Sequence, residues 1–221
     1  PQSITPAVRA LSPNIIVVPR PDVKITIGAV NKFLKWIPKV DAIVVGPGLG
    51  RQRTDGSCKL VRELASDGVN VVLDADALRT DIVNSVKGRD AVITPHTGEF
   101  NRLFGIDVTT SMEKRIDAVK KMASKSDVTI LLKSRIDVIS DGTNVILNRT
   151  GSPAMTAGGT GDVLSGIVAG LLAKGLDTFN AAALGAFFNG LAGEKVAETK
   201  GFHLVASDII DEIPNVMIKF E

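Results

Sequence analysis

A repeating pattern of short apolar runs constrains the fold of this chain more than any other sequence feature. Four such runs, rich in Val, Ile, Leu and Ala, lie at residues 42–45, 69–73, 91–93 and 128–132. Continuous apolar runs of this length are typical of strands that are buried on both faces of a parallel sheet. Because helical patterns separate the runs, the crossovers should be right-handed. The sequence therefore predicts an α/β domain with a mostly parallel central sheet flanked by helices.

Periodicity and turn signals place the remaining elements. We expect a strand at 15–18 and a hairpin of 138–140 with 145–147, joined through Asp141 and Gly142. We expect helices at 5–11, 26–36, 54–66, 111–125, 161–174, 180–198 and 207–213, and a short one that ends at Phe104. Trp36 is interpreted as a core residue. The chain shows no repeat, linker or break in composition, which predicts a single domain over residues 1–221.

Composition excludes several classes of protein. The 221 residues carry 26 basic and 24 acidic side chains, so no basic field attracts nucleic acid. Aromatic residues make up 4% of the chain and Tyr is absent, which disfavours recognition of single strands by stacking. The only cysteine, Cys58, fits a reducing, cytoplasmic setting and excludes an internal disulfide. No apolar run approaches the ~20 residues that span a bilayer, so no membrane association is expected.

The densest candidate site is the small-residue segment 151–162, Gly-Ser-Pro-Ala-Met-Thr-Ala-Gly-Gly-Thr-Gly-Asp, which runs directly into an apolar helical segment. A loop that leads into a helix leaves backbone N–H groups unpaired, with the positive end of the helix dipole behind them. Gly158, Gly159 and Gly161 allow close approach of a polyphosphate. This segment is therefore predicted to bind phosphate.

Asp162 stands where a carboxylate is electrostatically unfavourable beside a bound anion. That position favours a role in proton transfer. The alternative is an ordinary helix N-cap, which Asp also favours.

Polar or glycine-rich segments also follow four of the predicted strands, at the edge where open α/β sheets bind ligands. The segment 46–50, Gly-Pro-Gly-Leu-Gly, is either a tight turn or a backbone wall for a substrate. Asp74 and Asp76 could serve a metal or a substrate hydroxyl, or could cap the next short helix. Lys133 could neutralise a phosphate or be an exposed lysine at a turn.

His96 and Glu99 lie three residues apart at a predicted helix start. Glu99 could complete a capping box or hold Mg²⁺ through water. A single histidine in such a place is more often a hydrogen-bonding residue than a base.

Five motifs in order carry a resemblance to a known family. They are GPGLG at 46–50, LDADAL at 73–78, TPHTGEF at 94–100, LLKSRIDVISDG at 131–142 and GSPAMTAGGTGDVLSGIVAGLLAKG at 151–175. Together the motifs cover most of the chain, which resembles the ADP- or ATP-dependent NAD(P)H-hydrate dehydratases of the ribokinase-like superfamily. The resemblance implies a ribokinase-like three-layer fold. It also implies metabolite repair: hydrated NADH or NADPH (NADHX, NADPHX) is phosphorylated on its hydroxyl by an adenine nucleotide and then loses phosphate.

The resemblance also implies a role for each matching position. Asp162 would be the base and would contact substrate, and the anion hole would comprise Gly159, Thr160 and Gly161. Substrate contacts would come from Gly48, Gly50 and His96, and Glu99 would organise Mg²⁺. The adenine nucleotide would lie along Lys133, Ser134, Arg135, Ile136 and Asp137, and would also touch Gly161. Asp76 ranks below all of these.

Two departures from the family accompany the resemblance. The segment 133–137 lacks the family's Lys-Gly pair and following Thr, which leaves the choice between ADP and ATP open. The family's first strand, glycine-bearing loop and Ala-rich helix are also absent before the segment that matches residues 1–19, and we expect that these residues exist in the natural chain.

Two other functions remain open from the sequence. One is an alcohol kinase of the same superfamily, acting on a thiazole or pyrimidine alcohol, which would release a stable phosphorylated product. The other is a non-catalytic module that binds adenylates. The small-residue helices late in the chain also suggest a homo-oligomer.

Overall fold

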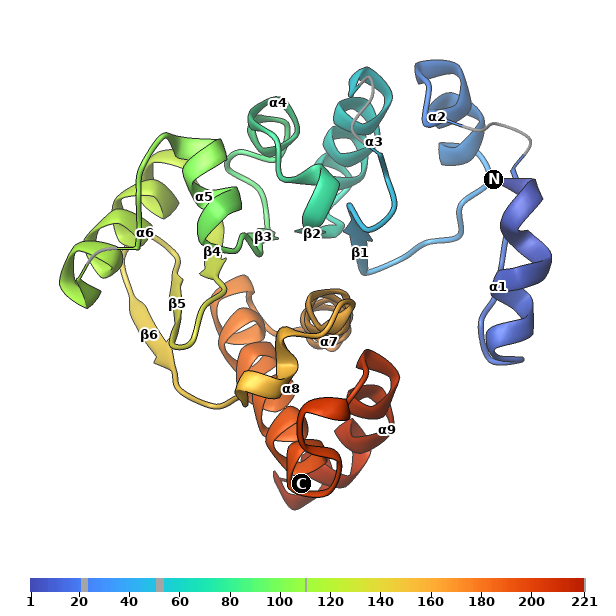
Figure 1. Cartoon of the computed structure of the whole chain (residues 1–221). Helices are drawn as coiled ribbons and strands as arrows, with labels where there is room; N and C mark the ends of the chain where they lie inside the picture. The colour runs from blue at the N-terminus through green and yellow to red at the C-terminus, as the bar shows by residue number, and fades with distance from the viewer. Residues whose placement is uncertain (21–23, 51–53, 110, 221) are drawn as a thin grey trace.

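The computed structural model describes residues 1–20, 24–50, 54–109 and 111–220. Its centre is a six-stranded sheet in which the strands follow one another in chain order (Figure 1). The strands are β1 (Ala42–Val45), β2 (Asn70–Leu73), β3 (Ala91–Ile93), β4 (Thr129–Leu132), β5 (Asp137–Ser140) and β6 (Val145–Asn148). The first four strands are parallel, and β5 and β6 form the predicted antiparallel hairpin. The mostly parallel sheet expected from the apolar runs is confirmed.

Helices cover both faces of this sheet and make three layers (Figure 1). The helices of one face are α3 (Asp55–Ser66), α4 (Thr80–Asn84), α5 (Thr97–Phe104) and α6 (Met112–Ser126). The other face is covered by α7 (Thr160–Ala173) and α8 (Thr178–Lys200), and α9 (Ala206–Met217) packs against α8. The sequence indicated a short helix after Asp74 and Asp76 without giving it bounds, and α4 follows that segment. The sequence placed the end of α9 too early, because Pro214 lies inside that helix.

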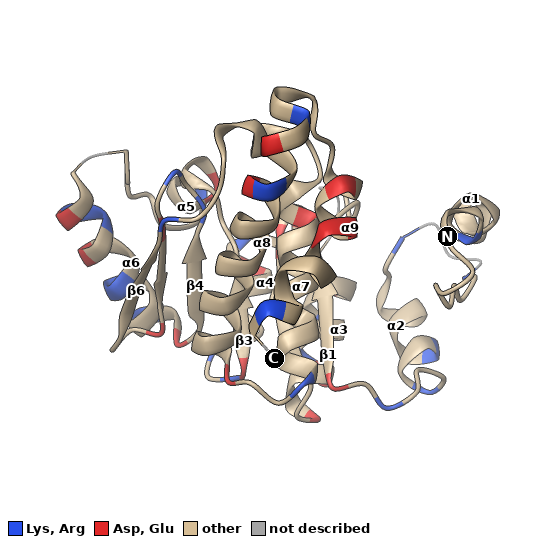
Figure 2. Cartoon of the chain, turned by 90° about the horizontal axis from the view of Figure 1, so that it is seen from below, with Lys and Arg blue, Asp and Glu red and all other residues tan. Residues whose placement is uncertain are grey.

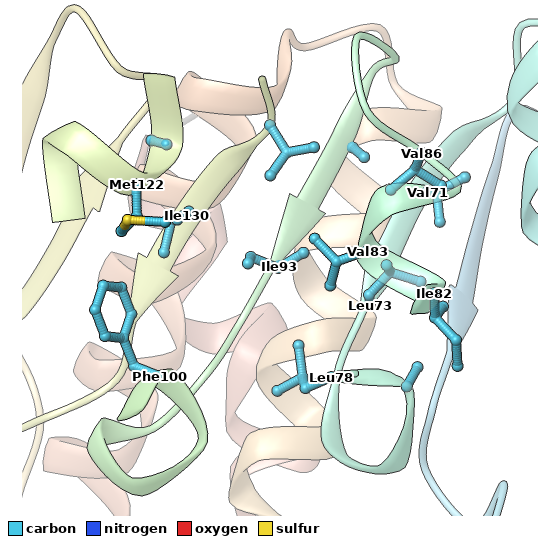
Figure 3. Packing of buried hydrophobic residues seen from close by; sticks show 14 of the residues in the cluster. Val71, Leu73, Leu78, Ile82, Val83, Val86, Ile93, Phe100, Met122 and Ile130 are labelled. Atoms are coloured by element: carbon cyan, nitrogen blue, oxygen red, sulfur yellow. The ribbon is translucent and has the colours of Figure 1, made fainter. Parts of the chain in front are cut away.

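Alternation along each strand divides the core between the two faces. Val71 and Leu73 of β2 pack with Ile93 and Phe100 beneath α3 to α6, where Figure 3 shows them. Val72, between the first two, packs with the helices α7 and α8 instead. Burial on both faces explains why the strands read as continuous apolar runs.

The two small-residue helices α7 and α8 approach each other closely, as predicted. A Cβ at Gly185 of α8 would lie 2.5 Å from Cγ2 of Val168 in α7. The start of α8 is capped by Asp177, whose carboxylate accepts from the Asn180 N–H at 2.9 Å. Gly201 caps its other end. The packing fixes α7, and with it the glycine loop, against the sheet.

The first forty residues depart most from expectation. The helices α1 (Thr5–Leu11) and α2 (Ile27–Leu34) are present and lie beyond β1 (Figures 1 and 2). Residues 15–18 do not form the predicted strand, because no part of the described chain offers them a ladder partner. Trp36 is 55% exposed rather than buried, and the Arg20 guanidinium lies 4.7 Å from its ring centroid. That expectation for Trp36 was wrong.

The charge pattern of α6 agrees with the sequence. The helix α6 carries both signs of charge on the outside of the sheet (Figure 2), as its amphipathic pattern predicted. Within the described ranges, no helix combines the length and the apolar character needed to cross a membrane.

Candidate active site

The polar segments that follow the strands meet at one edge of the sheet. The backbone N–H of Asp74 donates to the Val45 carbonyl at 3.1 Å, and the Lys133 N–H donates to the Pro95 carbonyl at 2.8 Å. His96 and Lys133 form an isolated parallel bridge. Because four parallel strands end here, segments that are far apart in sequence become neighbours. The predicted convergence at this edge is confirmed.

The glycine loop ends at a helix N-terminus, as predicted. Gly159 is the N-cap of α7 and has φ of +92°, a conformation that favours glycine. Asp162 is the third residue of the helix and is exposed, so it is not the N-cap. The structure thus excludes the capping alternative for Asp162 and leaves its carboxylate accessible in the first turn.

Thr160 can offer only its backbone N–H to an anion, because its hydroxyl is used within the loop. Its hydroxyl lies 2.9 Å from the Met155 carbonyl and 3.1 Å from the Ala157 carbonyl, so its single proton serves the loop itself. The far end of the loop is also anchored, because the Gly151 N–H donates to Oε1 of Glu194 at 2.8 Å. The backbone N–H groups at the helix start are what the loop can offer to an anion.

An ion pair between a half-buried lysine and a buried carboxylate lies behind this helix start. Nζ of Lys133, at the end of β4, lies 2.8 Å from Oδ1 of Asp74, at the end of β2. The Asp74 side chain is only 2% exposed, and its other oxygen, Oδ2, lies 2.8 Å from the hydroxyl of Ser165 in α7. Lys133 is therefore not the exposed turn lysine that the sequence left as an alternative. Asp74 is the N-cap residue of the following turn, Ala75–Ala77, but its side chain makes no capping hydrogen bond there.

The glycine segment after β1 depends on the acidic segment after β2. Gly46 is buried with φ of +143°, and a Cβ there would lie 1.7 Å from the Asp74 carbonyl oxygen. Gly48 and Gly50 also have positive φ and are exposed. The Gly50 N–H donates to Oδ2 of Asp76 at 3.0 Å. This segment is thus an exposed backbone surface that Asp76 fixes in place. From the sequence, Asp76 ranked below the other candidates, and this role was not predicted.

One residue separates the two carboxylates of this acidic segment. Ala75 has φ of +49°, in the left-handed region that a residue with a Cβ rarely adopts. Such strained conformations persist where the surrounding structure over-determines them, and they cluster at functional sites. Here the conformation allows Asp74 and Asp76 to bind different partners.

His96 is both an N-cap and an exposed side chain of this edge. Its Nδ1 accepts from the N–H groups of Gly98 and Glu99, and Glu99 Oε2 accepts from the His96 N–H at 2.9 Å. The capping box proposed for Glu99 is confirmed. Because Nδ1 is an acceptor, the proton of the neutral ring lies on Nε2, which lies 3.5 Å from Oε1 of Glu99.

The segment 133–137 is held by its own polar network. Oδ1 of Asp137 accepts from the Ser134 N–H at 2.9 Å, and Oδ2 accepts from Nδ2 of Asn148 at the same distance. Arg115 of α6 donates to the Ser134 hydroxyl at 3.0 Å. Burial raises the pKa of the Asp137 carboxyl above its ordinary value, although the hydrogen bonds from Asn148 and Ser134 and the charge of Lys133 oppose that shift.

Sequence reasoning missed four residues of this edge, Asp74 in its observed role, Arg115, Asn148 and Ser165. Each acts through a partner distant in sequence, so no local motif marks it. Arg135 is exposed, and Ile136 is half-buried and accepts a hydrogen bond from the Ser134 hydroxyl through its carbonyl at 2.5 Å. In the described part of the chain, no group of three or more His, Cys, Asp or Glu side chains could hold a metal ion.

Comparisons with known proteins show the family of the chain. The model of the NAD(P)H-hydrate dehydratase family matches residues 3–215. The chain belongs to this family. It is 44% identical to the ADP-dependent (S)-NAD(P)H-hydrate dehydratase of Cenarchaeum symbiosum, over all of this chain and 77% of that protein. It is 42% identical to the bifunctional NAD(P)H-hydrate repair enzyme Nnr of Pyrobaculum aerophilum, over all of this chain and 44% of that longer protein.

A solved structure extends the likeness to three dimensions. The ADP/ATP-dependent NAD(P)H-hydrate dehydratase of Bacillus subtilis, co-crystallised with ATP and Mg²⁺ and soaked with CoA, superposes with a TM-score of 0.81. It is 26% identical and covers all of this chain and 79% of its own. The ribokinase-like fold predicted from the motifs is therefore confirmed.

Proposed function

We propose that the protein dehydrates hydrated NADH or NADPH at the expense of ADP or ATP. Family membership supports this reaction, and one observation carries the proposal for the site. Asp162 lies exposed in the first turn of α7, beside the unpaired N–H groups that follow Gly159, and is not used as a cap. A carboxylate that lies beside an anion site and does not cap the helix is suited to accept a proton.

In the proposed first step, Asp162 accepts the proton of the substrate hydroxyl as its oxygen forms a bond to the terminal phosphorus of the nucleotide. The bond from that phosphorus to its bridging oxygen breaks, and the shortened nucleotide leaves with the electron pair. The backbone N–H groups of Gly159, Thr160 and Gly161 stabilise the charge of the transferred group. Such a step demands mainly positioning and electrostatic stabilisation from the protein.

In the second step, the substrate loses phosphate. The C–O bond breaks, its electron pair leaves with the phosphate, and loss of a proton from the neighbouring carbon restores the ring double bond. Hydroxide is a poor leaving group and phosphate a good one, which accounts for the nucleotide requirement.

The proposed substrate side comprises His96 and the exposed backbone at Gly48 and Gly50. Nε2 of His96 would donate to the hydrated dinucleotide, because Nδ1 is already an acceptor within its own helix cap. The proposed nucleotide side is the segment 133–137 with Gly161. The His96 and Lys133 backbones are paired, which supports neighbouring positions for the two proposed sides.

We also propose that Mg²⁺ arrives with the nucleotide. Mg²⁺ keeps several waters and is commonly bound through one or two carboxylates together with substrate phosphates. Glu99 is the candidate carboxylate. Its Oε2 serves the helix cap, and its Oε1 lies 3.5 Å from Nε2 of His96. When bound, the ion would neutralise the phosphate oxygens during transfer.

The test is recovery of dihydronicotinamide absorbance from hydrated NADH, with Mg²⁺ and either ADP or ATP, in the wild type and in Asp162→Asn. We expect recovery that requires nucleotide and that falls by at least about a hundredfold in the variant. A stable phosphorylated product would instead indicate an alcohol kinase. Nucleotide binding without any turnover would indicate an adenylate-binding module.

A cytoplasmic location, a homo-oligomeric state and a single domain remain predictions. Light scattering of the purified protein would test the second of these.

A further inference from the structure

The ammonium group of Lys133 lies at the unfavourable end of a helix. A Cβ built on Gly161, the second residue of α7, would lie 3.3 Å from Nζ of Lys133. The N-terminus of a helix carries partial positive charge, so cations are favoured at the opposite end. A lysine held here costs electrostatic energy until an anion binds.

Asp74 compensates for that cost in the absence of an anion. Its Oδ1 lies 2.8 Å from Nζ of Lys133, and the same Gly161 Cβ would lie 3.9 Å from its Oδ2. The carboxylate is thus behind the first turn of α7, on the side of the sheet edge. A lysine has three N–H donors, and Asp74 Oδ1 occupies one of them.

Ser165 completes the arrangement and connects it to the helix. Its hydroxyl lies 2.8 Å from Oδ2 of Asp74 and 3.0 Å from the Gly161 carbonyl, one turn earlier. Both oxygens of Asp74 therefore have a partner. This arrangement and the near-complete burial of Asp74 make it unsuited to proton transfer with a substrate, in contrast to the exposed Asp162.

We propose that Asp74, supported by Ser165, is a positioning residue that holds the Lys133 ammonium at the start of α7 to bind the phosphoryl group transferred from the nucleotide. Within segment 133–137, Lys133 thus serves the phosphate end of the nucleotide. The inference rests on the proposed function for the identity of the transferred group. Asp74 acts entirely through Lys133 and contacts no reactant.

Nucleotide binding tests the inference without any turnover. Adenosine, AMP, ADP and ATP are titrated calorimetrically into the full chain in the presence of Mg²⁺, in the wild type, Asp74→Asn and Lys133→Met. In both variants we expect ADP or ATP, whichever is the donor, to bind about tenfold to a hundredfold more weakly. Adenosine and AMP, which lack the transferred group, should keep their wild-type affinities.

A double variant separates positioning from general structure. If Asp74 acts through Lys133, Asp74→Asn should cause no further loss in the Lys133→Met background. This double variant also removes both members of the ion pair, so it does not leave the buried Asp74 or its lysine partner uncompensated. The double variant can therefore still be measured if Asp74→Asn by itself fails to fold. Ser165→Ala, which leaves both charges in place, should show a smaller loss of the same kind.

Asp76→Asn is the matched control for the binding ratios, since it removes a carboxylate from the same segment without touching Lys133. Equal weakening of AMP and of the donor nucleotide in Asp74→Asn, or additive losses in the double variant, would overturn the inference. The outcome is independent of the dehydration assay. A selective loss of donor binding without dehydration would retain the role of Asp74 and reject the proposed reaction.

Discussion

The Gly50 N–H and the Asp76 carboxylate, 26 residues apart, are joined by a hydrogen bond of 3.0 Å. The exposed glycine segment after β1 is therefore fixed by the acidic segment after β2. A backbone surface can recognise a substrate only if its N–H and C=O groups keep their direction, and this bond restrains Gly50.

Removal of that acceptor should weaken binding of the hydrated dinucleotide. In Asp76→Ala we expect KM for the hydrate to rise about tenfold, because a hydrogen bond to a charged group is lost. The nucleotide KM should be unchanged. Steady-state kinetics with each substrate varied in turn measures both. Asp76→Asn, which keeps an oxygen acceptor, is the matched comparison and should show a smaller effect. A rise in the nucleotide KM would contradict this division of roles.

His96 combines a structural and a binding role, and two substitutions separate them. Asn is a favourable N-cap, so His96→Asn should keep the thermal stability of the wild type, whereas His96→Ala should lose about 1 kcal/mol. Both variants lack the Nε2 donor and should show a higher KM for the hydrate. Thermal denaturation and kinetics provide the two measurements. If His96→Asn retains the wild-type KM, the side chain serves only as a cap.

Gly161→Ala should separate stability from activity. Gly161 lies in a helix, where Ala is favoured over Gly by up to about 1 kcal/mol, so the melting temperature should stay the same or rise. The new Cβ would displace the flexible end of Lys133, 3.3 Å away, and turnover should fall. Gly166→Ala is the control, because that glycine is in the same helix and a Cβ there meets nothing within 4 Å. Wild-type turnover in Gly161→Ala would refute the expectation.

The buried carboxyl of Asp137 predicts a pH dependence. Its pKa is raised in the folded state, so the folded protein binds this proton more tightly than the unfolded chain does. Ionisation therefore costs stability above the folded-state pKa, and the cost disappears as the pH falls below the unfolded-state value. We expect the free energy of unfolding of the wild type to improve relative to Asp137→Asn as the pH is lowered through this range. Urea titrations at several pH values measure the difference, and a constant or opposite trend would contradict it.

Much of the fold could be predicted from local patterns. The apolar runs at β1 to β4 identify the sheet because burial on both faces demands them, and Asp177 and Gly201 mark the ends of α8 through capping chemistry. Residues 15–18 and Trp36 were misassigned because an apolar residue has the same local signature whether or not a partner covers it. Whether one does is a property of the tertiary structure.

The sequence could predict where the residues of the candidate site lie, but not which of them contact each other. Strand ends placed Asp74 and Lys133 at one edge, yet 59 residues separate the two, and nothing in either motif indicates an ion pair. Ser165 lies within an apolar helical pattern, where a small polar residue has no special signal. The sequence could not decide whether Asp162 or His96 caps a helix. The structure shows that Gly159 caps α7 and that His96 caps α5.

The left-handed residue Ala75 lies between the two carboxylates that contact the two proposed sides of the site. Its neighbours on either side hold the lysine on the proposed nucleotide side and the backbone on the proposed substrate side. Both are thus attached to one short turn at the end of a buried strand. In the proposed function, this one turn would set the spacing between phosphoryl donor and acceptor before either molecule binds.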